Sequence, residues 1–287
     1  MTAPALVAVA HGSRDPRSAA TIDELAAEVR RQRPGLDVRV SFLDLSAPRL
    51  PYVLDGVAAD GHRHAVVAPL LLGNAFHARS DVPGLVSAAT GRHPRMRIDT
   101  ADVLGGDAGT DAAALDRLRT ALRADLAGNP PAAQASHALR HRATACEVCA
   151  VPAPDARAVD PLADPELGVV LASVGSTRAE ANRVVADRVA CWRARFGWAA
   201  ASGAYVTAAE PTPAQAIDAV RAAGARRVAV VPWVLAPGRL PDRIDEAAAG
   251  GGALVADPIG PHPHLAAAVL RRWAAAAAPD AGVRQVS

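Results

Sequence analysis

Short apolar runs alternate with longer amphipathic stretches along the first 126 residues. The runs are continuous and of strand length, whereas the stretches between them carry apolar residues at helical spacing. The predicted elements are a strand at 6–10, a helix at 15–32, a strand at 36–43, a helix at 50–60, a strand at 64–72, a helix near 82–90, a strand near 96–103 and a helix near 111–126. This alternation predicts a parallel sheet that is covered by helices on both faces.

The same pattern returns in the second half of the chain. A shift of 163 residues, without a gap, superposes glycines and prolines at turn positions, where other residues are poor substitutes. The matches include Gly12 with Gly175, Pro48 with Pro211, Gly61 with Gly224 and Pro69 with Pro232. The second copy is predicted to have strands at 168–174, 198–206 and 227–235 and helices near 178–194, 213–223 and 263–277. We expect an α/β protein of two tandem duplicated domains, each a small parallel sheet flanked by helices.

The domain boundaries follow from the composition between and after the two copies. Residues 129–166 are rich in proline, alanine and polar residues without periodicity, which is typical of a linker. We therefore expect an N-terminal domain at 1–128, a C-terminal domain at 167–278 and a tail at 279–287.

Charge and composition exclude several classes of partner. The 31 basic residues are interspersed among 29 acidic ones, and aromatic residues make up 3% of the chain, so nucleic-acid binding is not expected. The sequence has no apolar run of roughly 18 residues and no basic leader at its start, so we expect a cytoplasmic protein without a membrane partner. Three cysteines in a chain of this size do not predict a disulfide framework.

Candidate chemistry lies at the ends of the predicted strands of the first copy. His11 follows the first strand, Asp44 the second, and His77 lies in the loop after the third. Ligands of open parallel sheets bind beyond the carboxyl ends of the strands, so these side chains are expected at one edge. Two imidazoles and a carboxylate form a site for a divalent first-row metal ion.

The alternative is that each histidine merely caps a helix or bonds a nearby carbonyl. The second copy argues against it, because Val174 stands at the position of His11 and no histidine matches His77. A structural cap should be needed in both sheets. Asp81 and Asp242 precede a helix in both copies, so we interpret them as N-caps.

Three segments of the first copy carry a family resemblance. VAHGSR at 9–14, SFLDLSAP at 41–48 and GNAFHARSDVP at 73–83 resemble the class II tetrapyrrole chelatases, specifically the sirohydrochlorin cobaltochelatases and ferrochelatases. The resemblance implies a bilobal α/β enzyme, a metal chelatase of the lyase class, that holds a tetrapyrrole in a cleft between lobes. It implies insertion of Fe²⁺ or Co²⁺ as substrate, with no cofactor required for catalysis.

The family's two metal-binding histidines match His11 and His77, and its acidic residue, usually glutamate, is here Asp44. We expect the three to present the metal and to share the removal of the pyrrole protons. Because sirohydrochlorin bears many carboxylates, arginines are expected around it. The predicted substrate-binding residues are Ser13, Arg14, Asn74 and Arg79, with Arg178, Arg239 and Arg243 at the matching edge of the second copy.

A second cluster of candidate ligands lies in the linker. His137, His141, Cys146 and Cys149 form an H-x3-H-x4-C-x2-C pattern, which could hold zinc or an iron–sulfur cluster. The spacing matches no standard zinc finger, so an inert linker and a metal-delivery role stay open alternatives.

Three functions remain to be compared. The first is a sirohydrochlorin chelatase, with Fe²⁺ for siroheme favoured over Co²⁺ for cobalamin. The second is a metal or tetrapyrrole carrier without turnover, which would not need His11 and His77 as a pair. The third is a phosphate-handling α/β enzyme, which the absence of a glycine-rich phosphate loop at the first turn disfavours.

Overall fold

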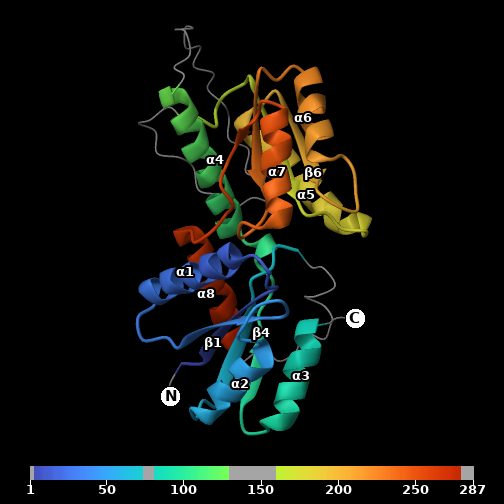
Figure 1. Ribbon diagram of the computed structural model, residues 1–287. Helices are drawn as coiled ribbons and strands as arrows, with labels where there is room; N and C mark the ends of the chain where they lie inside the picture. The colour runs from blue at the N-terminus through green and yellow to red at the C-terminus, as the bar shows by residue number, and fades with distance from the viewer. Residues whose placement is uncertain (1–2, 74–80, 129–159, 279–287) are drawn as a thin grey trace. The chain divides into compact units, whose positions relative to one another are not determined.

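The computed structural model describes residues 3–73, 81–128 and 160–278 (Figure 1). The first repeat forms β1 (Ala5–Ala10), α1 (Pro16–Gln32), β2 (Val38–Phe42), α2 (Leu50–Ala59), β3 (His64–Pro69), α3 (Val82–Arg92), β4 (Arg97–Thr100), the short 3-10 helix η2 (Leu104–Gly106) and α4 (Ala108–Gly128). The second forms β5 (Leu167–Ser173), α5 (Ala179–Phe196), β6 (Ala200–Tyr205), α6 (Pro213–Ala222), β7 (Arg227–Pro232), α7 (Arg239–Gly250), β8 (Leu254–Val255) and α8 (Pro263–Ala277).

Two four-stranded parallel sheets confirm the predicted fold class. Their strand orders are β2-β1-β3-β4 and β6-β5-β7-β8, so the two repeats share one topology. The register repeats as well: Val7 lies opposite Arg39 and Val67 in the first sheet, and Val170 lies opposite Ser202 and Val230 in the second. Strand β8 was not among the predicted elements, and helix α7 was implied only by the interpretation of Asp242 as an N-cap.

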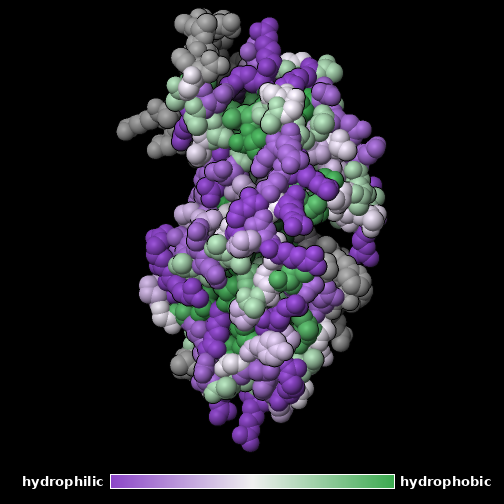
Figure 2. All heavy atoms as spheres, viewed as in Figure 1, coloured by the Kyte–Doolittle hydropathy of each residue, from purple (hydrophilic) through white to green (hydrophobic). Residues whose placement is uncertain are grey.

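Alternate residues of the central strands point to opposite faces, and both faces are buried. Ala5, Val7 and Val9 of β1 join the core cluster formed with α2 and α3. The residues between them, such as Leu6, are also fully buried, and α1 and α8 pack against each other and the sheet (Figure 1). Strands that are apolar on both faces are therefore continuous hydrophobic runs. On the side of the molecule seen in Figure 2, polar side chains cover most of the surface.

Proline and polar caps set where the helices begin. Five of the described helices have proline at their first or second position, where the missing N–H costs no hydrogen bond; they are α1, α2, α3, α6 and α8. Asp15 caps α1 by accepting a hydrogen bond from the backbone N–H of Arg17 at 3.0 Å. Thr212 and Gln215 form a capping box at the start of α6.

The compact units of the structure are not the two contiguous segments that the repeat suggests. One unit contains residues 1–110, 235–238 and 260–287, and the other contains 111–234 and 239–259. Helix α8, from the second repeat, thus belongs to the unit of the first sheet, and all but the first turn of α4 belongs to the unit of the second. Within the first unit, Trp273 of α8 donates a hydrogen bond to the carbonyl oxygen of Pro4 at 3.3 Å.

Candidate metal site at the strand ends

The loops after β1 and β2 are joined by backbone hydrogen bonds. The N–H of Leu43 donates to the carbonyl oxygen of Ala10, and the N–H of Asp44 donates to that of His11, each at 2.9 Å. These bonds extend the parallel pairing of the two strands past their ends. The structure therefore brings His11 and Asp44 together at the carboxyl edge of the first sheet.

Gly12 makes this close approach of the two loops feasible. Its φ is +93°, which is costly for residues with a side chain, and a Cβ there would lie 1.7 Å from the carbonyl oxygen of Asp44. The space that a side chain would fill is occupied by the neighbouring loop. The glycine after the histidine is thus required by the geometry that places His11 beside Asp44.

Asp44 is held as an exposed carboxylate by two neighbours. The backbone N–H of Leu45 lowers the pKa of Asp44, and the guanidinium of Arg49 lowers it further, with Arg49 Nη1 2.8 Å from Asp44 Oδ1. Arg49 Nη1 also donates to the carbonyl oxygen of Leu43 at 3.1 Å. A carboxylate with a lowered pKa is a weak base but a ready ligand for a cation.

Arg49 is the residue of this site that the sequence analysis missed. It occupies the N-cap position of α2, five residues after Asp44. The signal in the sequence was a basic residue five positions after a candidate carboxylate ligand. Spacing alone does not show that the two side chains form an ion pair.

The half-buried ring of His11 has its Nδ1 3.3 Å from the carbonyl oxygen of Gly12. A proton on Nδ1 can be donated to that oxygen, and in this tautomer Nε2 carries the lone pair that binds a metal. The strand end thus supplies an imidazole and a carboxylate on adjoining loops.

The third predicted ligand, His77, lies outside the described residues, as do Asn74 and Arg79. The chain enters that loop from β3, which pairs with β1 on the side opposite to β2. Leu70, just after β3, donates its N–H to the carbonyl oxygen of Val9 at 2.8 Å. The loop thus starts beside the end of β1, and a contact of His77 with His11 stays a prediction.

Ser13 has a local structural role. Its hydroxyl accepts a hydrogen bond from the N–H of Asp15 at 3.0 Å, and its backbone N–H and carbonyl both bond the hydroxyl of Ser46, at 3.0 and 2.9 Å. These bonds fix the loop that carries His11. Arg14 is exposed. Contacts of Ser13 and Arg14 with substrate stay predictions.

The second repeat has the same loop backbone without the candidate ligands. The N–H of Thr207 donates to the carbonyl oxygen of Val174 at 2.9 Å, as Asp44 does to His11, and a Cβ on Gly175 would lie 2.1 Å from the carbonyl oxygen of Thr207. Both repeats place a cis proline four residues after the Asp44 or Thr207 position. The fold of this loop therefore does not depend on a histidine or a carboxylate.

The two aspartates that were interpreted as N-caps do not act as such. Asp81 stands at the N-cap position of α3 but makes no capping hydrogen bond with its side chain. Asp242 lies within the first turn of α7, because that helix begins three residues earlier, at Arg239. Asp242 therefore lies among the first N–H groups of the helix, where a negative charge is favourable.

The linker cluster His137, His141, Cys146 and Cys149 also lies outside the described residues. Within residues 3–73, 81–128 and 160–278, no group of three or more histidine, cysteine, aspartate or glutamate side chains is placed to hold a metal ion. Zinc or iron–sulfur binding by the linker stays a prediction.

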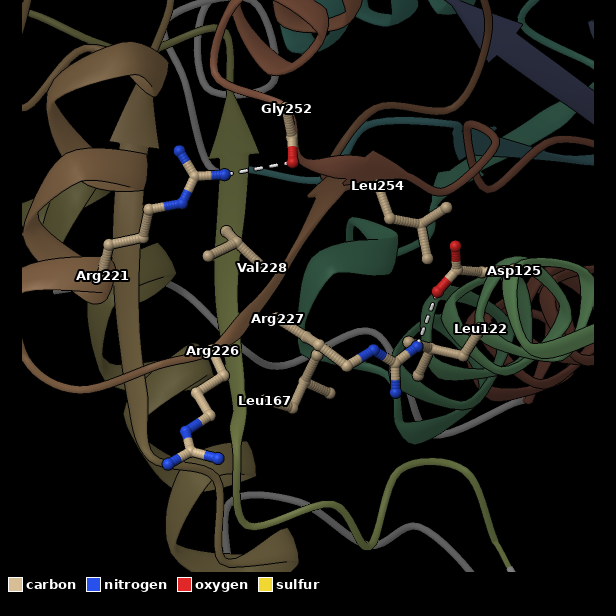
Figure 3. A pocket seen from close by; sticks show the side chains of 9 residues that line it. All are labelled: Leu122, Asp125, Leu167, Arg221, Arg226, Arg227, Val228, Gly252 and Leu254. Atoms are coloured by element: carbon tan, nitrogen blue, oxygen red, sulfur yellow. Dashed lines mark hydrogen bonds and ion pairs between the residues drawn. The ribbon is translucent and has the colours of Figure 1, made fainter. Parts of the chain in front are cut away.

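One pocket of the second unit lies at the opposite end of its sheet (Figure 3). It has a volume of about 180 Å³ and is lined by Arg227, at the start of β7, and Leu167, at the start of β5. Figure 3 shows Arg227 directed to Asp125, at 2.7 Å, and Arg221 directed to the carbonyl oxygen of Gly252, at 3.0 Å. These guanidinium groups are bound to acceptors of the protein, and the pocket has no histidine.

Two curated proteins are similar to part of this chain. The sirohydrochlorin cobaltochelatase of Methanothermobacter thermautotrophicus is 34% identical over 88 residues, which are 30% of this chain and 61% of that protein. The sirohydrochlorin ferrochelatase of Bacillus subtilis is 31% identical over 106 residues, 36% of this chain and 40% of that protein. The aligned part thus spans less than two thirds of either relative.

Solved structures show the fold over a larger part of the chain. SirB from Bacillus subtilis with Fe³⁺ matches with a TM-score of 0.69 and 20% identity, covering 98% of both chains. The sirohydrochlorin chelatase SirB from Bacillus subtilis subspecies spizizenii, in complex with cobalt, matches with a TM-score of 0.71 and 21% identity, covering 98% of this chain and 97% of that one.

In the described part of this chain, no helix is long and apolar enough to span a membrane.

A family model supplies the last comparison. The CbiX model matches residues 5–121 and again residues 168–276. These two matches cover both repeats, including both sheets and the loops that carry His11 and Asp44. They account for most of the chain, and this chain therefore belongs to the CbiX family.

Proposed function

We propose that this protein is a chelatase that inserts a divalent metal ion, Fe²⁺ or Co²⁺, into sirohydrochlorin. Iron is our preferred metal, with siroheme as the eventual product. Relatives with either metal in their names align with this chain, so the preference rests on the expected wider need for siroheme. The metal ion and the tetrapyrrole are both substrates, and no resident cofactor is required.

One observation carries the proposal. His11 and Asp44 adjoin at the carboxyl edge of the first sheet, whereas Val174 and Thr207 occupy the same backbone positions in the second. The second repeat keeps the backbone of the loop but lacks both of the side chains that we predict to bind the metal ion. This contrast supports a chemical role for the pair in the first repeat.

The proposed reaction exchanges one metal ion for two protons. Bonds from the ring nitrogens to the metal form as two pyrrole N–H bonds break, and neither partner is oxidised or reduced. Asp44, whose pKa is lowered by Leu45 and Arg49, suits the role of ligand to the incoming ion. A neutral imidazole has one nitrogen that can bind a metal ion or accept a proton, so His11 suits either role, together with the predicted His77.

The test transfers residues from the second repeat to the first. The variants His11→Val and Asp44→Thr introduce the side chains of Val174 and Thr207. The second repeat carries these side chains on a loop with the same backbone hydrogen bond. Metal insertion is followed by the absorption of sirohydrochlorin with Fe²⁺ or Co²⁺ in the absence of oxygen. We expect the wild-type protein to accelerate insertion and each variant to lose about 100-fold or more, with an unchanged Tm.

Two outcomes would contradict the proposal. Acceleration at the wild-type rate by a variant that combines His11→Val and Asp44→Thr would show that the pair is not part of the site. Tight binding of sirohydrochlorin by the wild-type protein without faster insertion of either metal would indicate a carrier instead of an enzyme.

A further inference from the structure

Leu45, directly after Asp44, combines two unfavourable features. Its φ is +62°, in the left-handed region where the Cβ of a leucine crowds the backbone, and 44% of the residue is exposed to solvent. The exposed part of this apolar side chain contributes nothing to the core, while the backbone conformation is unfavourable. Strained residues cluster at active sites, ligand clamps and switch regions.

The second repeat shows that the loop does not need this side chain. Ala208 occupies the position of Leu45 and has a φ of +59°. The hydrogen bond that closes the loop is also the same in both repeats. Phe42 donates its N–H to the carbonyl oxygen of Pro48, and Tyr205 donates its N–H to that of Pro211, each at 2.9 Å. A methyl group is therefore sufficient for the fold of the loop. The larger side chain occurs in the repeat that has His11 and Asp44.

The surroundings of Leu45 match the chemistry of a carboxylated macrocycle. Its backbone N–H lowers the pKa of Asp44, and Asp44 is in turn paired with the half-exposed Arg49. An apolar side chain thus lies beside a candidate metal ligand and a cation. A tetrapyrrole has an apolar ring face and an anionic rim, and binding sites for such ligands combine apolar contact with a few placed charges.

We propose that Leu45 contacts the ring face of the tetrapyrrole and so raises the affinity of the protein for it beside His11 and Asp44. This inference rests on the proposed function and adds a specific binding residue to it. Leu45 takes no part in proton transfer or in metal binding. It acts on the affinity for the tetrapyrrole alone.

Three variants of Leu45 separate apolar contact from backbone strain. Leu45→Ala reproduces the second repeat, Leu45→Asn introduces a polar residue that tolerates a positive φ, and Leu45→Met retains apolar bulk. The matched control is Val184→Ala, which trims another exposed apolar side chain, 54% exposed, in α5. For each protein we would measure the Kd of metal-free sirohydrochlorin from its fluorescence, the KM for each substrate, kcat and the Tm.

We expect the Ala and Asn variants to raise both the Kd and the KM for sirohydrochlorin about five- to tenfold, since the exposed part of Leu45 is the area that the ring would cover. The KM for the metal and kcat should change by less than about twofold, and the Tm by no more than a few degrees. Leu45→Met and Val184→Ala should match the wild type in every quantity. An unchanged Kd in Leu45→Asn, or an equal loss in Val184→Ala, would overturn the proposal. The Kd is measured without metal, so it tests the role of Leu45 even if the wild type proves to be a carrier. If the wild type does not insert metal, the proposed function is refuted, but the role of Leu45 in binding the tetrapyrrole is not.

Discussion

A buried ion pair in the second unit joins helix α4, from the first repeat, to helix α5, from the second. Its contribution to stability therefore tests whether α4 packs in the second unit. Arg188 of α5 and Asp111 of α4 are 7% and 2% exposed, and Arg188 Nε lies 2.6 Å from Asp111 Oδ1. The guanidinium also lies over Trp233, 4.4 Å from the ring centroid. At the position of Arg188, the first repeat has Leu25, which is 2% exposed.

The Asp111→Ala variant leaves the charge of Arg188 buried without its carboxylate. Removing one partner of a buried pair costs about 3–5 kcal/mol, whereas replacing both partners with apolar residues is often neutral or stabilising. For a unit of this size, the single variant should lower the Tm by about 10 °C. The double variant Arg188→Leu with Asp111→Ala, which copies the leucine of the first repeat, should lie within about 1 kcal/mol of the wild type.

Urea unfolding of the wild type, both single variants and the double variant completes a double-mutant cycle. The reasoning fails if Asp111→Ala costs less than about 1 kcal/mol, because a desolvated charge cannot be that cheap. It also fails if the double variant is as unstable as the single ones, since the pair would then be needed for packing and not merely for charge neutralisation.

Two further predictions concern the candidate site and acid stability. Gly12→Ala should abolish metal insertion and lower the Tm, because its Cβ would overlap the carbonyl of Asp44; Gly35→Ala, at a φ of +83° with no atom within 4 Å of the added carbon, should cost only about 1 kcal/mol and keep full activity. A hydrogen bond from His93 lowers the pKa of Asp55, and in Asp107 hydrogen bonds from Arg271 and a backbone N–H together outweigh the raising effect of burial. Because these folded-state pKa values lie below the unfolded ones, their stabilisation is complete above the unfolded pKa, and the free energy of unfolding should fall below about pH 4 as the carboxylates are protonated. Urea titrations across this range should show a shallower fall in Asp107→Asn, and a free energy that stays constant down to about pH 3 would contradict the assignment.

Much of the fold could be predicted from the sequence because its strands are buried on both faces. Continuous apolar runs such as residues 6–10 need no tertiary information to be recognised, and the glycines and prolines of the turns locate the repeat. Strand β8 was missed because it has two residues, both only half-buried. In helix α7, RLPDRIDEAAAG, Leu240, Ile244 and Ala248 recur at helical spacing, but its first residues were interpreted as part of the loop after β7.

The assignment of helices to units could not be predicted in the same way. Periodicity shows that 263–277 is an amphipathic helix, but it does not show which sheet the apolar face covers. The specific contacts decide it: Trp273 binds the backbone at Pro4, and Arg271 pairs with Asp107, both within the first unit. Likewise, only the folded loop reveals that Arg49 reaches back to Asp44.

Helix α8 of the second repeat belongs to the first unit, and most of helix α4 of the first repeat belongs to the second unit. The second unit is therefore an insertion within the sequence of the first. Except for four residues, the second unit is one continuous stretch, 111–259, and the first unit closes around it in sequence with 260–287. As the chain leaves the ribosome, all elements of the second unit emerge before the last helix of the first. The unit that carries His11 and Asp44 thus begins synthesis first and is completed last. A chain truncated before α8 would hold a finished second unit and a first sheet that lacks the helix packed on β3 and β4.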